Sequence, residues 1–237
     1  MKFSLLFTAA LIAIWPLKNH AQTESDATAS DDSDTNEVVT LKDLMASNNI
    51  VTNTIGVVLV KISPDYWVGK FEVTQDAYQK LIGSNPSAFS GGQNPVDSVS
   101  WNDAMDFCKK LTEKETKGKQ LPVGYAYSLP TENQWEKLVA DAALSDAVTS
   151  LPPNHHSSTA PVGSLGANSL GLYDTRGNVM EWCLDSNNPQ MYKVLRGGAW
   201  DTAVEPSLRI QFRNYAQPGE KKNDYGFRIV LQSGSSQ

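Results

Sequence analysis

The sequence predicts an α+β domain that combines few helices, short antiparallel strands and long loops. Amphipathic helical segments are confined to the part of the chain before residue 144. Beyond that point Pro, Gly, Asn and Ser recur every few residues, and only short runs of strand-forming residues interrupt them. Helices early and irregular loops with short strands late indicate a domain with a large loop-built surface.

Two short strands are predicted early in the chain and two late. The early strands are Ile55–Ile62 and Trp67–Val73, and the late strands are Tyr192–Arg196 and Tyr225–Leu231. All are rich in the β-branched or aromatic residues that are typical of strands.

Three helices are predicted from their capping residues and apolar periodicity. The first follows Thr74 and ends at Ile82, because Gly83 favours a helix end. The second follows Ser100 and extends over about residues 101–116. Its apolar side chains recur every three or four residues, which predicts one buried face. That face comprises Trp101, Ala104, Met105, Cys108 and Leu111.

The third helix, Glu132–Ala143, follows a capping box of Thr131 and Gln134. Its inward side is predicted to consist of Trp135, Leu138 and Val139.

Composition excludes several classes of protein. The 237 residues carry a formal net charge of −6, which argues against nucleic acid as an electrostatic partner. Two cysteines cannot form a disulfide-rich scaffold or a four-cysteine metal site. Three histidines leave little material for a histidine-rich metal centre.

The first 40 residues are predicted to stand outside the folded domain. Residues 1–21 combine Lys2, an apolar run and a small residue, Ala21, which is the pattern of a cleaved signal peptide; an uncleaved anchor is the alternative. Residues 22–40 hold six acidic and no basic residues and are predicted to form a disordered spacer. The domain is assigned to residues 41–237, with its core over about 57–231, and carries a charge of only about −2.

Eight phrases in the domain resemble the sulfatase-modifying-factor family, also called the formylglycine-generating-enzyme-like family. They occur in the family's order and extend from the first predicted strands to the last. The phrases are Gly69-Lys-Phe-Glu-Val-Thr-Gln75, Gly83-Ser-Asn-Pro86, Asn94-Pro-Val, Val99-Ser-Trp-Asn-Asp-Ala104, Leu129-Pro-Thr-Glu-Asn-Gln-Trp-Glu136, Gly171-Leu-Tyr-Asp-Thr-Arg-Gly-Asn-Val-Met-Glu-Trp182, Val194-Leu-Arg-Gly-Gly-Ala-Trp200 and Gly226-Phe-Arg228. The resemblance implies an irregular variant of the C-type-lectin-like fold.

The resemblance does not by itself imply an activity, because the family includes more than one. Its oxidase members hold copper between two cysteines. Counted along the stretch Arg213 to Arg228, those positions are Glu205 and Ile210 here, and neither side chain can bind Cu(I). Iron-dependent relatives use a histidine cluster, whereas His155 and His156 form an isolated pair in a loop. We therefore expect neither copper nor iron, and we name no catalytic residue.

The two cysteines that are present, Cys108 and Cys183, stand elsewhere. In the family a cysteine near the Gly-Phe-Arg phrase can pair with the helix cysteine, but that position is Ile229 here. Cys108 is predicted to be a core residue. A Cys108–Cys183 disulfide is the alternative in an oxidising compartment.

The best metal candidate is the loop from Asp174 to Glu181. The resemblance implies a structural calcium ion bound by Asp174, Gly177, Val179 and Glu181, two of them through backbone oxygens. Two carboxylates and a tight glycine turn suit the oxygen ligands that calcium prefers. The alternative is an empty turn held by hydrogen bonds of Arg176 and Asn178.

The segment 200–215 corresponds to the family's active-site surface. Arg209, Gln211 and Arg213 alternate with apolar residues, which predicts a half-buried strand with one polar face. The expected ligand residues are Trp200, Asp201, Arg209 and Gln211. The alternative is that the arginines pair with Asp201, Glu205 or Asp224; Arg213 and Arg228 are assigned a structural role.

These inferences predict an exported, non-catalytic binding or accessory protein, periplasmic or extracellular, with a structural calcium ion. We expect its partner to be an unidentified protein or polar ligand, with no nucleic acid and no stable membrane insertion after signal cleavage. The first alternative is an oxidoreductase of the formylglycine-generating type that acts on protein or small-molecule thiols. The second is a variable ligand-display domain.

Overall fold

The computed structural model describes residues 39–188 and 191–234. The predicted signal peptide, residues 1–21, and nearly all of the spacer, residues 22–40, lie outside this part. Thr40, the last residue assigned to the spacer, is described, and it forms a capping box with Asp43 at the start of a first helix. This helix, α1 (Leu41–Ser47), was not predicted from the sequence. In the described ranges, no helix is both long enough and apolar enough to cross a membrane.

Two sheets form the framework. The larger is antiparallel throughout and contains five strands. From edge to edge these are β1 (Ile50–Thr52), β2 (Val58–Ser63), β3 (Tyr66–Gly69), β9 (Val230–Ser233) and β4 (Tyr125–Ser128). This order places β9, a strand near the end of the domain, between β3 and β4, so the two ends of the domain are joined in one sheet.

The smaller sheet contains four strands and lies nearer the loops. Their order is β7 (Asn214–Ala216), β6 (Tyr192–Arg196), β5 (Met180–Asn188) and β8 (Tyr225–Gly226). The β5–β8 pair is parallel, and the other pairs are antiparallel.

The predicted strand Tyr225–Leu231 is divided between the two sheets. Its first residues form β8 in the smaller sheet, and its last residues begin β9 in the larger one. The residues between them are held by backbone bonds from Val73 N–H to the Phe227 carbonyl and from Gly69 N–H to the Ile229 carbonyl. The crossing between the sheets therefore presents the Arg228 side chain to the interior.

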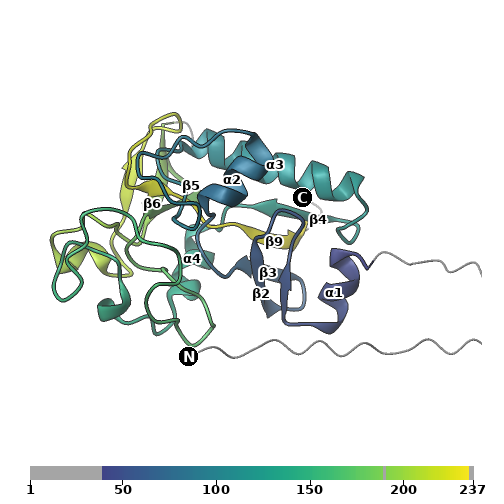
Figure 1. Ribbon diagram of the computed structural model, residues 1–237, viewed down its shortest axis with the longest axis horizontal. Helices are drawn as coiled ribbons and strands as arrows, with labels where there is room; N and C mark the ends of the chain where they lie inside the picture. The colour runs from purple at the N-terminus through teal and green to yellow at the C-terminus, as the bar shows by residue number, and fades with distance from the viewer. Residues whose placement is uncertain (1–38, 189–190, 235–237) are drawn as a thin grey trace, which may run out of the picture. The chain divides into compact units, whose positions relative to one another are not determined.

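The three predicted helices form where their caps indicated. They are α2 (Gln75–Ile82), α3 (Trp101–Lys117) and α4 (Glu132–Val139). Figure 1 shows α2 and α3 along one side of the β9 and β4 strands, and the loops that follow α4 at the opposite end from α1. Two short 3₁₀ helices, Leu144–Asp146 (η1) and Glu205–Leu208 (η2), lie among those loops.

The α4 helix ends four residues earlier than the predicted Ala143. The side-chain amide of Asn168 donates hydrogen bonds to the carbonyls of Leu138 and Val139, which are the last of the helix. Ala140 then takes a positive φ of 45°, which breaks the helical path. The end is thus set by a residue from a distant loop.

The main core lies between the α2–α3 layer and the larger sheet, and it includes Cys108, Phe107 and Leu111 from α3. Cys183 lies in a different cluster, with Trp135, Val139 and Val194. Both cysteines are buried and free, so the predicted core position of Cys108 is confirmed and no Cys108–Cys183 disulfide is present.

Candidate functional site

The loop from Asp174 to Glu181 is almost entirely buried, and it links the two sheets to the loop-built end of the domain. Gly177 has a φ of +80°, and a Cβ at this position would lie 2.5 Å from the Val148 carbonyl oxygen. Only glycine therefore allows the loop to approach Val148 so closely. Asn178, also at positive φ, bonds through its side chain to Glu72 and to the backbone of Ala160.

Glu181, the last residue of this loop, forms an ion pair with Arg228. Both side chains are inaccessible: Arg228 is 0% exposed and Glu181 is 1% exposed. The guanidinium donates to both Glu181 oxygens, at 2.7 to 3.3 Å, and the Trp135 indole N–H donates to Glu181 Oε2 at 3.0 Å. Arg228 also donates to the carbonyls of Gly69 and Tyr173. Every one of these partners comes from a different loop or element, so the pair acts as a structural clamp, as predicted for Arg228.

Two further buried carboxyl groups, Glu72 and Asp174, lie near the pair. Glu72 accepts hydrogen bonds from the Asn178 side chain and the Val179 N–H. Asp174 accepts one from the Gly163 N–H at 2.7 Å. Burial raises the pKa of Glu72 well above its ordinary value, and the charges of Asp174 and Glu181 raise it further. Burial also raises the pKa of Asp174 to about 6. Glu72 was not singled out from the sequence, although it lies inside the Gly69–Gln75 phrase.

The arrangement of the four predicted calcium ligands does not fit a calcium ion. Glu181 has both oxygens engaged by Arg228 and Trp135, and a guanidinium in that place would repel a cation. In the described ranges, no group of three or more His, Cys, Asp or Glu side chains is arranged to hold a metal. Asn178 and Arg176 make the kind of hydrogen bonds that the alternative of a hydrogen-bonded turn expected. The engagement of Glu181 argues against the predicted calcium ion, which a calcium titration tests directly.

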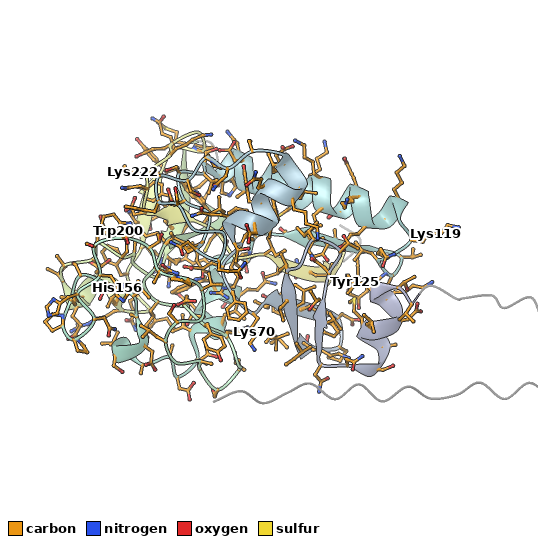
Figure 2. All side chains as sticks on the ribbon, in the orientation of Figure 1. Lys70, Lys119, Tyr125, His156, Trp200 and Lys222 are labelled. Atoms are coloured by element: carbon orange, nitrogen blue, oxygen red, sulfur yellow. The ribbon has the colours of Figure 1, made fainter. Side chains whose placement is uncertain are left out.

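Trp200 and Asp201 form the first half of the predicted ligand surface. The Trp200 indole is half-buried, meets Phe89 edge to face at 5.1 Å and donates to the Asn223 carbonyl at 3.1 Å. Asp201 is exposed. Burial of Asp224 raises its pKa to about 6, and the nearby charge of Asp201 contributes to this rise. Figure 2 shows Trp200 on the loop-built side of the molecule.

Arg209 and Gln211 form the second half, but they do not lie on a strand. The segment 209–213 is a turn after η2, closed by a bond from the Phe212 N–H to the Arg209 carbonyl, so the predicted strand is wrong. Pro206 at the start of η2 favours a helical turn there over an extended strand. The exposed Arg209 and Gln211 still alternate with half-buried Ile210 and Phe212.

The arginines of this segment are paired, and only one pair matches a prediction. Arg209 lies 3.6 Å from Glu205, as the alternative interpretation expected. Arg213 pairs instead with Glu132 and Glu136 of α4, which also bind the fully buried Arg196. Arg213 therefore has the structural role that was predicted, although Glu132 and Glu136 were not the predicted partners.

A cleft of about 390 Å³ lies between η2 and the loop that follows α4. It is lined by Leu144, Ser145, Thr149, Leu151, Pro152, Pro153, Glu205 and Leu208. Both halves of the predicted surface adjoin it: Arg209 directly follows Leu208, and Ser150 bonds to the Asp201 carbonyl. Among the described residues, no hydrogen bond or ion pair joins Trp200 or Asp201 to Arg209 or Gln211, so the four do not form one polar network.

The two positions that correspond to the copper cysteines lie in this same segment. Glu205 is exposed at the cleft, and Ile210 packs against the cluster of Trp135, Val139, Cys183 and Val194. The family model of the sulfatase-modifying factor enzyme 1-like domain matches residues 43–233, which is most of the chain. The chain belongs to this family.

The relatives of this chain and its structural neighbours are named for different roles. Chaperone protein LppX of Paenibacillus barcinonensis is 27% identical over 70% of this chain and 80% of its own length. Inactive Cα-formylglycine-generating enzyme 2 of Mus musculus is 30% identical over 59% of this chain and half of its own length. Among solved structures, Treponema denticola variable protein 1 has a TM-score of 0.60 and 25% identity, over 70% of this chain and 84% of that one. The predicted family and the α+β, C-type-lectin-like fold are confirmed.

Proposed function

We propose that this chain is an exported, non-catalytic member of the sulfatase-modifying-factor family that binds a protein or polar ligand as an accessory protein. The observation that carries the proposal is the chemistry at the two copper positions. Glu205 pairs with Arg209 at the rim of a cleft, and Ile210 packs into an apolar cluster. A carboxylate and an alkyl group cannot replace the soft thiolate pair that Cu(I) requires.

The remaining thiols support the same proposal. Cys108 and Cys183 are 1% and 0% exposed, and burial raises the pKa of both thiols. For Cys183 the charge of Glu181 raises the pKa further. Because the thiolate is the nucleophile and the metal ligand, a buried protonated thiol is suited to neither role.

The relatives support an accessory role over an oxidase role. One is named as a chaperone and another as an inactive form of the enzyme, and the chain covers 80% of the former. We assign the ligand to the cleft beside η2 and to the predicted residues that adjoin it in the chain, Arg209 after Leu208 and Asp201 through its bond from Ser150.

The likeness to a variable protein favours one second candidate, a ligand-display domain. In such a domain we expect the segment 200–215 to be rich in Asn, Ser and Tyr. Only three of its 16 residues are of these types, which ranks the candidate below an accessory protein.

The oxidase alternative is tested by incubating the purified protein with copper and a sulfatase peptide that contains Cys-x-Pro-x-Arg. We expect the peptide mass to be unchanged, and conversion of its cysteine to an aldehyde would overturn the proposal. A double variant, Glu205→Cys with Ile210→Cys, is the matched control: it should retain Cu(I) against a chelator that strips the wild type. Export is tested separately, by comparing the cellular fractions that contain the full chain and a variant without residues 1–21.

A further inference from the structure

A second cleft has a volume of about 290 Å³, and one of its lining residues, Glu72, bonds to Asn178 and Val179 of the buried loop. It is bounded by the turn between β1 and β2, the start of α2 and the backbone around Gln93 and Val162, and it shares no lining residue with the cleft beside η2. Its walls are mostly apolar: Ile55, Val57, Val58, Phe71, Ala77 and Val162. An apolar cleft of this size with a few polar groups suits a small molecule.

The Phe71 ring is fixed in the wall of this cleft. A Cβ at Gly163 would lie 2.6 Å from the ring, so glycine there admits it. The ring also packs against the Tyr173 ring, with 5.2 Å between the two centroids. The cleft thus offers a rigid aromatic side chain that does not have to be ordered when a ligand binds.

Two of the polar lining groups already have their hydrogen-bond partners. Glu72 accepts from the Asn178 side chain and the Val179 N–H, and the Thr74 hydroxyl accepts from the Ala77 N–H as a helix cap. These groups shape the cleft but are not free to recognise a ligand.

Asp76 differs from them because it is exposed and has spare acceptor capacity. Among the described residues only the Gln93 side chain donates to its carboxylate, at 2.9 Å, and no lysine or arginine pairs with it. The carboxylate lies against the loop backbone at Gly92, where a Cβ would meet its oxygens at 2.4 Å. Asp76 is therefore held in a defined position with one oxygen open.

The lining offers negative charge and no positive charge. Neither lysine nor arginine is among the lining residues; Lys70 lies over the Phe71 and Tyr173 rings, 5.5 and 5.3 Å from their centroids, without lining the cleft. A carboxylate, an aromatic ring and apolar walls together are the groups that recognise an ammonium ion with an apolar chain.

We propose that this cleft binds a small primary amine, whose ammonium group pairs with Asp76 while its short apolar chain lies between the β1–β2 turn and Phe71. The site is independent of the proposed accessory function, because none of its residues belongs to the segment 200–215.

The probe is pentylamine, titrated into ¹⁵N-labelled protein and followed by NMR to about 10 mM, which exceeds the millimolar dissociation constant typical of so small a ligand. We expect saturable shifts of the amides of Gly56, Ala77 and Gln93. Pentanol should bind up to about fivefold more weakly, since it lacks the charge that pairs with the exposed Asp76, and pentanoate weaker still. Equal binding of pentanoate, shifts confined to other residues, or no saturable shift would each overturn the proposal.

The decisive variant is Asp76→Asn, which keeps the shape of the side chain and its capacity to accept from Gln93. We expect it to weaken pentylamine up to about fivefold, as the loss of an exposed ion pair does, and to leave pentanol unchanged. Asp106→Asn, which removes an exposed carboxylate of α3, is the matched control and should bind as the wild type does. If Asp76→Asn binds pentylamine as the wild type does, Asp76 does not recognise the amine and the proposal fails.

Discussion

Arg228 joins parts of the chain that are distant in sequence. Its guanidinium contacts Glu181 in β5, the Gly69 carbonyl at the end of β3 and the Tyr173 carbonyl just before the buried loop. A buried charge is tolerated only when it is paired and its hydrogen bonds are made, and here both conditions hold. Removing either partner leaves the other as an uncompensated buried charge.

Arg228→Met is accordingly expected to destabilise the domain by about 3–5 kcal/mol, because Glu181 would remain buried without a counter-ion. Urea unfolding measures the free energy of unfolding. Lys109→Ala breaks an exposed pair with Glu113 and should cost no more than about 1 kcal/mol. A loss for Arg228→Met as small as that of the control would contradict the assigned clamp.

Asp174 gives the stability of the domain a predictable dependence on pH. Its pKa of about 6 in the folded protein lies above the ordinary value of 3.8, so the folded state binds the proton more tightly than the unfolded state. Its contribution therefore destabilises the fold above pH 6, and the free energy of unfolding rises as pH falls from 6 to 3.8. Asp174→Asn should flatten this part of the pH profile and raise stability at pH 7 by up to about 3 kcal/mol. Unfolding curves of the two proteins in chelator, at intervals of pH, check this.

The same variant tests calcium at the loop. If calcium binds Asp174, added calcium raises the melting temperature of the wild type and chelator lowers it, and Asp174→Asn abolishes the difference. Because Arg228 already engages Glu181, we expect no shift in either protein. A calcium-dependent shift that the variant lacks would show that the ion displaces the guanidinium.

At the scale of the elements, Gly177 determines how the buried loop approaches Val148. Gly177→Ala would bring a methyl group against backbone atoms that cannot move aside, in addition to the strain of its positive φ. Gly83 also has a positive φ but has open space around it, so Gly83→Ala isolates the conformational cost of about 1 kcal/mol. We expect Gly177→Ala to lose at least twice as much stability as Gly83→Ala in thermal unfolding; equal losses would mean that the loop can relax.

The helix starts were predictable because capping is local. Thr74, Ser100 and Thr131 each accept the hydrogen bond that their position in the sequence indicates. The end of α4 was not predictable in the same way, because it depends on Asn168, about 30 residues further along the chain. The start of α1 is not evident from the sequence, because its cap, Thr40, directly follows the acidic segment and has the same polar character.

At the scale of the whole molecule, the candidate surface was only partly predictable. The resemblance located the segment 200–215, but pairing across the fold determines which of its side chains are free. Arg213 is bound to Glu136, 77 residues away, whereas Arg209 pairs with Glu205 four residues away. Local spacing in the sequence indicates the Arg209–Glu205 pair, but it carries no information about the pairing of Arg213 with Glu136.

The distribution of sulfur across the molecule gives the final prediction. Both thiols lie in apolar clusters on different elements, and the two copper positions, Glu205 and Ile210, hold none. A thiol-specific maleimide should therefore leave Cys108 and Cys183 unmodified in the native protein and label both once urea unfolds it. Lys80→Cys places a thiol on the exposed face of α2 and should be labelled at once, which shows that the reagent is active. Labelling of native Cys183 at the rate of that control would mean that the cluster of Trp135, Val139 and Val194 opens to solvent, and a reactive thiol would then be available next to Ile210.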